Sequence, residues 1–217
     1  MRTHNGRIAL VTGASKGVGA EVARQLASTG THVVVNHHQD TQRADAVVSS
    51  ICTAGAHAST WAADIFDEAD TTAMIDAIGD RFGRLDTMVL TAGGGLDAAV
   101  NPGYAMRRNR DAHRRLALSA LPLMPAGGRI LFVTSHQAHF FPDKAVPKGY
   151  AATAASLRAG ETALYSLRSE FARAGIGFTV VSGDMLDGFA TTVGDSATSV
   201  NPPGIVYVGR ADYLMTA

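Results

Sequence analysis

Near its amino terminus the chain contains the stretch Thr12-Gly13-Ala14-Ser15-Lys16-Gly17-Val18-Gly19, which follows an apolar run and opens a helical pattern. Gly13 permits a tight turn, and Gly17 and Gly19 let the backbone and the following helix approach a ligand closely. The helix start offers unpaired N–H groups and the positive end of the helix dipole. Because a strand pattern precedes the turn and a helix pattern follows it, we predict a pyrophosphate-binding turn rather than a turn without a ligand.

Short apolar runs alternate with longer helical patterns along the rest of the chain. The expected strands are Arg7–Thr12, His32–Asn36, Ala56–Ala62, Asp86–Thr91, Arg129–Thr134, Gly177–Val181 and Ile205–Val208. The expected helices are Val18–Ser28, Gln42–Thr53, Glu68–Arg81, Tyr104–Leu121 and Tyr150–Arg173. Such alternation means crossover connections and parallel strands. We therefore expect an α/β fold with a doubly wound parallel sheet, the Rossmann fold, in a single domain over residues 1–217.

The composition narrows the class of function. Lys plus Arg and Asp plus Glu both number 19, so the balanced charge gives no general attraction to nucleic acid or an anionic membrane. Cys52 is the only cysteine, which excludes an internal disulfide and favours a reducing compartment. No run approaches the ~20 apolar residues that cross a bilayer, and the first residues lack the pattern of a secretory signal. We expect a cytoplasmic protein that acts on a small-molecule substrate.

Further motifs follow the glycine turn in order. They are Asp64 after the third expected strand, Thr91-Ala92-Gly93 at the end of the fourth, Asn109 in the next helix and Ser135 at the end of the fifth strand. On these residues the chain resembles the short-chain dehydrogenase/reductase family over residues 7–190. The resemblance implies an oxidoreductase that acts on a carbonyl or alcohol, with Ser135 and Asn109 in its catalytic site. It also implies cofactor-binding residues Gly13, Ser15, Lys16, Gly17, Val18, Gly19, Asn36, His37, Asp64, Ile65, Ala92, Gly93 and Gly183.

The residues after the second expected strand bear on the choice of cofactor. Rossmann domains that use NAD carry an acidic residue there, which binds the ribose 2′-OH. Here Asn36 is followed by His37 and His38, so no carboxylate would repel a 2′-phosphate. Lys16 could reach that phosphate and His37 could add a donor, unless both are solvated loop residues. The missing acid favours NADP(H).

The tyrosine and lysine of the family's catalytic site lack clear counterparts. The resemblance implies a tyrosine as general acid/base and a lysine four residues later, whose charge lowers the tyrosine pKa. The first tyrosine after the catalytic serine is Tyr150, but Ala154 stands four residues on. Alternatively, Thr153–Gly160 matches the family's Tyr-x-Ala-Ser-Lys-x-Ala-Gly, which puts Thr153 at the tyrosine and Leu157 at the lysine. Both registers stay open, and both lack the lysine.

A seven-residue repeat supports an apolar role for position 157. Leu157, Leu164 and Phe171 form one stripe of an amphipathic helix, so Leu157 should face the core. The alternative source of a positive charge is the preceding loop, from which Lys144 or Lys148 could swing in.

Two histidines follow the catalytic serine. The stretch Ser135-His136-Gln137-Ala138-His139-Phe140 lies at the carboxyl end of a strand, where open α/β sheets bind ligands, and it resembles an actinobacterial subgroup of the family. His136 or His139 could serve as acid/base, since histidine titrates near neutrality. The alternative is that both pack against the sheet edge. Without a cluster of Cys or carboxylate ligands, we expect no metal site.

The carboxyl-terminal part departs from the family pattern. Ser182-Gly183-Asp184 stands where the resemblance implies the Pro-Gly that borders the nicotinamide. The segment after Thr191 has little helix signal, so we expect a shortened substrate region over about 192–204. Helices that begin at Tyr104 and Tyr150 correspond to those through which relatives pair, which implies a homodimer or homotetramer.

Three functions remain open at this point. The first is an NADP(H)-binding oxidoreductase with an altered catalytic set, in which Tyr150, Thr153 or a histidine replaces the missing tyrosine. The second is a non-redox enzyme on the same scaffold, such as a cyclase, isomerase or dehydratase. The third is a catalytically inactive cofactor-binding or regulatory protein. Fold alone does not choose among them.

Overall fold

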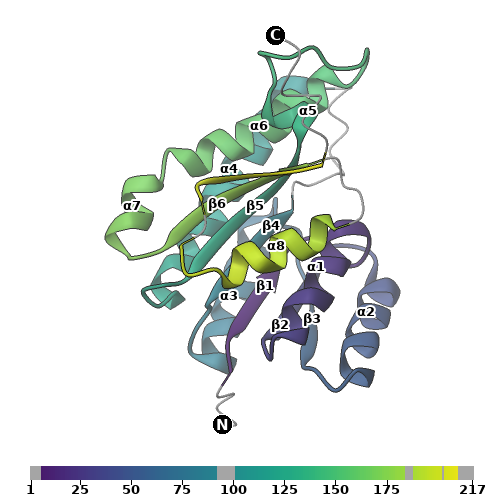
Figure 1. Cartoon of the computed structure of the whole chain (residues 1–217), viewed down its shortest axis with the longest axis vertical. Coiled ribbons are helices and arrows are strands. Elements are labelled where there is room, and N and C mark those ends of the chain that lie inside the picture. Colours follow the sequence, from purple (N-terminus) through teal and green to yellow (C-terminus); the bar gives the residue numbers. More distant parts are fainter. Residues whose placement is uncertain (1–5, 92–100, 184–187, 202, 210–217) are drawn as a thin grey trace.

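A parallel sheet forms the centre of the molecule (Figure 1). The structure is a computed structural model that describes residues 6–91, 101–183, 188–201 and 203–209. In these residues the sheet has seven strands in the order β3-β2-β1-β4-β5-β6-β7. The strands are β1 (Ile8–Val11), β2 (His32–His37), β3 (Ala58–Ala62), β4 (Thr87–Thr91), β5 (Arg129–Ser135), β6 (Gly177–Gly183) and β7 (Ile205–Val208). The predicted doubly wound α/β fold is confirmed.

Helices cover both faces of this sheet, as Figure 1 shows. They are α1 (Gly17–Ser28), α2 (Thr41–Thr53), α3 (Glu68–Phe82), α4 (Pro102–Ala120), α5 (His136–His139), α6 (Ala151–Tyr165), α7 (Arg168–Arg173) and α8 (Phe189–Thr198), with a 3₁₀ turn η1 (Leu121–Leu123). Because successive side chains of a strand point to opposite faces of the sheet, β1 contributes side chains to two hydrophobic cores. Ile8 and Leu10 pack in the core under α3, α4, α6 and α7, while Ala9 and Val11 pack under α1, α2 and α8.

The strand order reverses between β1 and β4, which places a crevice at their carboxyl ends. The chain starts in the middle of the sheet, builds β2 and β3 outward, and returns to build β4 on the other side of β1. Open α/β sheets bind ligands at this switch point. The glycine turn after β1 and Ser135 at the end of β5 both lie at this edge. None of the helices in the described ranges is long and apolar enough to cross a membrane.

The expected helix Tyr150–Arg173 is two helices. Helix α6 ends at Tyr165, and α7 begins at Arg168. At the break, Ser166 Oγ donates to the carbonyl oxygen of Ala163 at 2.6 Å. A serine hydroxyl that bonds to a carbonyl in the preceding turn competes with the helix ladder.

The expectation of little helix after Thr191 was wrong. Helix α8 buries Phe189, Val193 and Ala197, which are spaced four residues apart and pack in the core beside α1. This spacing is the pattern of an amphipathic helix, although the many small polar residues between these positions obscured it. Much of the segment 192–204 is thus a core helix, and a shortened substrate region stays a prediction.

Candidate active site

The glycine turn has the close contacts that only glycine tolerates. Gly13 and Gly17 adopt φ of 60° and 57°, in the left-handed region that favours glycine. A Cβ on Gly19 would lie 2.6 Å from the carbonyl oxygen of Gly13, so α1 approaches the turn too closely for any side chain. Helix α1 starts at Gly17 and presents its amino-terminal N–H groups at the switch point. The turn therefore has the shape of a phosphate cradle.

The side chain of Asn36 forms a hydrogen bond with the backbone of this turn. This contact corrects the role that was expected for Asn36 at the ribose. Its side chain is buried, and its Oδ1 accepts from the N–H of Gly13 at 3.4 Å. Its Nδ2 donates to the carbonyl oxygen of Ala63 at 3.0 Å and lies 3.4 Å from that of Trp61. Because both polar atoms of its amide form hydrogen bonds within the protein, Asn36 connects the ends of β1, β2 and β3 rather than facing a cofactor.

The neighbouring residues retain groups that a nucleotide could use. The Nδ1 atom of His37 is buried without a hydrogen-bond partner among the described residues. Lys16 is exposed in the glycine turn. A buried polar atom without a partner carries a desolvation cost that a bound ligand would remove. His37 and the glycine cradle therefore fit a dinucleotide phosphate and ribose.

Asp64 lies in the turn after β3, where it is partly committed. Its Oδ1 accepts from the backbone N–H of Phe66 at 3.0 Å, and its Oδ2 lies 3.6 Å from Nη2 of Arg108 on α4. The carbonyl oxygen of Ile65 accepts from Arg115 at 3.3 Å. An adenine-binding role for Asp64 and Ile65 stays a prediction. The predicted cofactor residues Ala92 and Gly93 lie outside the described residues.

The structure brings the hydroxyl groups of Ser135 and Tyr150 together. The two oxygens lie 3.4 Å apart at the carboxyl edge of the sheet. Ser135 ends β5 and caps α5, since its Oγ accepts from the backbone N–H of Ala138 at 3.2 Å. Tyr150 stands at the start of α6. Thr153, the alternative tyrosine position, is partly buried one turn further along and makes no hydrogen bond with Ser135 within the described residues. The geometry therefore favours Tyr150 as the partner of Ser135.

Leu157 is buried beside Tyr150, as the apolar stripe predicts. It is 8 % exposed and packs with Ala138 and Ala154 in a small cluster against which the Tyr150 ring lies. This cluster is separate from the main core that contains Leu164. In the Thr153 register the lysine position is therefore filled by an apolar side chain, which lies in the cluster that the Tyr150 ring packs against. In the Tyr150 register the lysine position is Ala154, which lies in the same cluster.

Asn109 contacts α6, and its predicted role in the active site stays a prediction. Its Nδ2 donates to Oγ of Ser156 at 2.6 Å, and its Oδ1 is buried without a partner among the described residues. Its carbonyl oxygen accepts from Nδ1 of His113 at 2.7 Å. Burial lowers the pKa of His113, so this imidazole stays neutral. Asn109 therefore supports the contact between α4 and α6.

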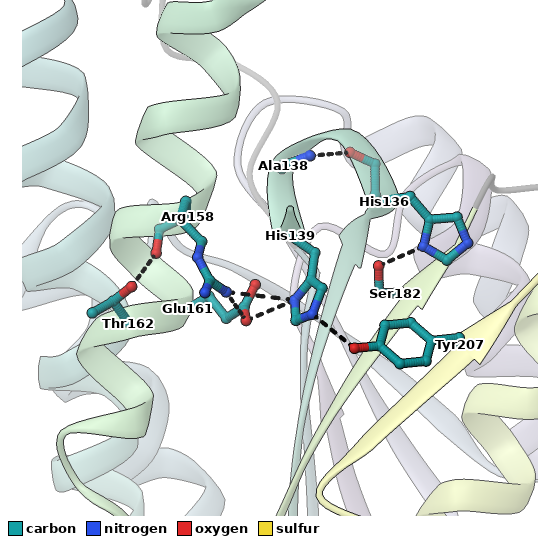
Figure 2. A network of polar contacts seen from close by, with 9 residues as sticks. His136, Ala138, His139, Arg158, Glu161, Thr162, Ser182 and Tyr207 are labelled. Atoms are coloured by element: carbon teal, nitrogen blue, oxygen red, sulfur yellow. Dashed lines mark hydrogen bonds and ion pairs between the residues drawn. The ribbon is translucent and has the colours of Figure 1, made fainter. Parts of the chain in front are cut away.

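The two candidate histidines differ in what their ring nitrogens contact. His136 donates through Nε2 to the carbonyl oxygen of Val208 at 3.1 Å, and its Nδ1 accepts from Oγ of Ser182 at 2.8 Å. Both nitrogens thus join β5 to β6 and β7, which favours the packing alternative for His136 over the acid/base role. His139 instead donates through Nδ1 to Oε1 of Glu161 at 2.8 Å (Figure 2).

Glu161 was missed in the sequence. It is fully buried on α6 and also pairs with Arg158. A signal was present, because Glu161 interrupts the apolar stripe between Leu157 and Leu164 and a buried acid requires partners. Burial and the neighbouring Glu161 raise the pKa of Tyr165 to about 12.

Gly183 has a packing explanation. A Cβ there would lie 2.4 Å from a ring atom of Phe189 on α8. Glycine at this position lets α8 close over the end of β6. The predicted role of Gly183 beside the nicotinamide stays a prediction.

Comparison with known proteins agrees with this geometry. The family model for short chain dehydrogenases matches residues 7–195. A probable tetrahydroxynaphthalene reductase of Zymoseptoria tritici is 34% identical over 164 residues, which cover 73% of this chain and 60% of that protein. An oxidoreductase of Methylorubrum extorquens is 43% identical over 88 residues, 41% of this chain and 36% of that protein. The chain thus matches less than two thirds of the length of these curated relatives.

Solved structures match over nearly the whole chain. The promiscuous reductase LugOII, which catalyses keto-reduction at C1 during lugdunomycin biosynthesis, has a TM-score of 0.82 at 26% identity, covering 99% of this chain and all of that one. A short chain dehydrogenase of Burkholderia cenocepacia in complex with NADP has a TM-score of 0.78 at 27% identity, covering 94% and 96%. Fold and site define a dinucleotide-binding α/β protein. The chain belongs to the short chain dehydrogenase family.

Proposed function

We propose that this protein is an NADP(H)-dependent oxidoreductase that reduces a carbonyl group of a small molecule, or oxidises the corresponding alcohol. The observation that carries the proposal is the 3.4 Å contact between the Ser135 and Tyr150 hydroxyls at the carboxyl edge of the sheet. The NADP-bound dehydrogenase of Burkholderia cenocepacia and the keto-reduction by LugOII support the cofactor and the reaction class.

The residues of this chain divide into binding and proton-transfer roles. The glycine turn would hold the pyrophosphate, with Lys16 and His37 toward the 2′-phosphate. NADP(H), when bound, supplies the hydride. The hydroxyls of Ser135 and Tyr150 would both contact the substrate oxygen, and Tyr150 would give its proton to that oxygen as negative charge develops there. Leu157 supplies no positive charge beside this tyrosine, so turnover of simple ketones should be slow.

The first prediction tests cofactor binding. NADPH should bind more tightly than NADH, because no carboxylate stands at 36–38 and Lys16 is exposed in the turn. Lys16→Ala should reduce this preference about 5-fold, since an exposed ion pair contributes ~1 kcal/mol at most. Titration of nicotinamide fluorescence measures both affinities, with Arg81→Ala at the opposite edge of the sheet as control. Equal or tighter binding of NADH by the wild type would contradict the cofactor assignment.

Absorbance of NADPH then tests the reaction. A panel of small aliphatic and aromatic ketones should include compounds whose addition causes NADPH oxidation by the wild type. Tight NADPH binding without turnover of any ketone, or of any alcohol with NADP⁺, would overturn the oxidoreductase proposal and favour a non-redox or regulatory function.

Assembly is the second prediction. A groove of about 730 Å³ runs along α4 and α6, with Met106, Ala155 and Ala159 among its apolar lining and arginines beside them. We propose that a second copy of the chain packs here, as a homodimer or as part of a homotetramer. Ala159→Glu should convert the oligomer to a monomer at micromolar concentration, measured by light scattering, whereas Ala46→Glu on the exposed face of α2 should not. A monomeric wild type would refute this assembly.

A further inference from the structure

A single buried carboxylate joins elements that surround the Ser135–Tyr150 pair. His139 on α5 donates through Nδ1 to Oε1 of Glu161 on α6 at 2.8 Å, and Arg158 pairs with the same oxygen. The other ring nitrogen of His139 lies 3.3 Å from the hydroxyl of Tyr207 on β7. Figure 2 shows these side chains converging between the helix and the strand. One acid thus links α5, α6 and β7.

We propose that Glu161 is a positioning residue of the oxidoreductase site, which acts through His139 to hold the turn that carries Ser135 against the helix that begins at Tyr150. The proposal rests on the function proposed above. It assigns Glu161 a role without direct contact to substrate or cofactor.

The shortness of α5 explains why such an anchor is needed. This helix has only four residues, so it cannot fix its own direction through a helix ladder. Ser135 caps its first turn and His139 is its last residue. Ser135 is the last residue of β5, so a shift of His139 would act on the Ser135 hydroxyl through the hydrogen bond that its Oγ accepts from Ala138 in this turn.

The two hydroxyls belong to the two elements that Glu161 joins. Ser135 leads into α5, and Tyr150 leads into α6, which also carries Glu161. The intervening residues 140–149 form a long connection rather than a rigid element. The contact between His139 and Glu161 therefore fixes how the Ser135 and Tyr150 oxygens face each other.

The burial of Glu161 argues for a geometric rather than a stabilising role. Its side chain is fully buried, and its Oε2 has no hydrogen-bond partner among the described residues. Desolvation can exceed the attraction within a buried ion pair, so such a pair is weak evidence for stability, whereas its directional bonds define a unique arrangement. His139 is 6 % exposed and can meet the carboxylate in only a narrow range of orientations.

The experiment compares Glu161→Gln with His139→Gln and their double variant. Glu161→Gln keeps the shape and an acceptor for His139 but removes the charge. We expect kcat for carbonyl reduction to fall about 10–100-fold, because a small misplacement of the reacting groups is costly. The affinity for NADPH should be unchanged, because the glycine turn lies between β1 and α1. The double variant should be no slower than the slower single variant, since both changes break one connection. Glu68→Gln, at an exposed position on α3, is the control.

A second measurement does not depend on turnover. The ¹³Cζ NMR signal of Tyr150, assigned through Tyr150→Phe, reports the surroundings of its hydroxyl. It should shift in Glu161→Gln and in His139→Gln and stay in place in Glu68→Gln. His139→Gln leaves the ion pair between Glu161 and Arg158 intact. This variant therefore tests the proposal even if Glu161→Gln fails to fold.

The outcomes separate this proposal from the proposed function. If the Tyr150 signal shifts in the variants but the wild-type protein reduces no ketone, the positioning role is supported and the reductase function is rejected. An unmoved signal in the folded variants would overturn the positioning role, even if turnover fell. Additive losses in the double variant would also overturn it, because Glu161 would then act independently of His139.

Discussion

Tyr150→Phe should lower the rate of carbonyl reduction by about 10²–10⁴-fold, the usual cost of removing a positioned general acid. The change removes only the hydroxyl, which lies 3.4 Å from Oγ of Ser135. The ring that packs against the small apolar cluster beside α5 remains. We therefore expect little change in stability and a loss confined to kcat, measured with NADPH and the best ketone of the panel.

The control for this variant is Tyr104→Phe, which removes the same group from an exposed position on α4. The affinity for NADPH should be unchanged in both variants. If Tyr150→Phe retained the full rate and Thr153→Ala lost it, the proton donor would be Thr153, and the alternative register would be correct. Full activity in both variants would show that the hydroxyl pair at this edge is not the catalytic group.

The strand pattern and the glycine turn could be predicted because their signals are local. Each buried strand is a short apolar run, and Gly13, Gly17 and Gly19 carry a steric requirement in their own backbone. The sheet order follows from crossover rules that apply to any alternating chain. Helix α8 was missed because its apolar positions are few and separated by small polar residues.

Asn36 shows why the cofactor site was only partly predictable. Its position at the end of β2 suggested a ribose contact, but its side chain bonds to the turn after β1 and to Ala63 after β3. Such bonds connect three strands that are distant in sequence. Only the assembled sheet shows that His37, one residue later, has a buried Nδ1 atom without a hydrogen-bond partner among the described residues.

The contacts around Ser135 and Tyr150 were less predictable, because a connection outside the helices and strands, residues 140–149, determines them. The contact of Ser135 with Tyr150 depends on the path of residues 140–149, which no periodic pattern describes. The contact of His139 with Glu161 likewise joins residues that belong to different elements. Sequence analysis found Ser135, Tyr150 and His139 individually but could not show which partners they meet.

The missing lysine leads to the second large effect. Leu157→Lys should raise the rate of carbonyl reduction by about tenfold, because a nearby positive charge stabilises the negative charge that develops on the tyrosine oxygen as its proton is transferred. Leu157 lies in the same cluster as the Tyr150 ring. Helical side chains lean toward the amino terminus of their helix, which is where Tyr150 stands. A lysine at 157 would therefore extend toward the Tyr150 hydroxyl.

Burial opposes this gain, because an ammonium at a site that is 8 % exposed is partly desolvated. The comparison is thus with Leu157→Met, which keeps an apolar side chain of similar length and should leave the rate unchanged. Chemical denaturation of both variants would show how far the charge lowers the free energy of unfolding. A lysine at Ala154 is a poorer test, since that position is fully buried against α5.

The double variant Tyr150→Phe with Leu157→Lys decides whether the lysine acts through Tyr150. If it does, the rise disappears in the double variant, because no hydroxyl remains for the charge to activate. If Thr153 instead occupies the tyrosine position, Leu157→Lys alone gives no rise, and adding Thr153→Tyr restores activity. A rate that is unchanged by Leu157→Lys in both the wild-type and the Thr153→Tyr background, in a folded protein that still binds NADPH, would mean that this site moves its proton without an adjacent cation.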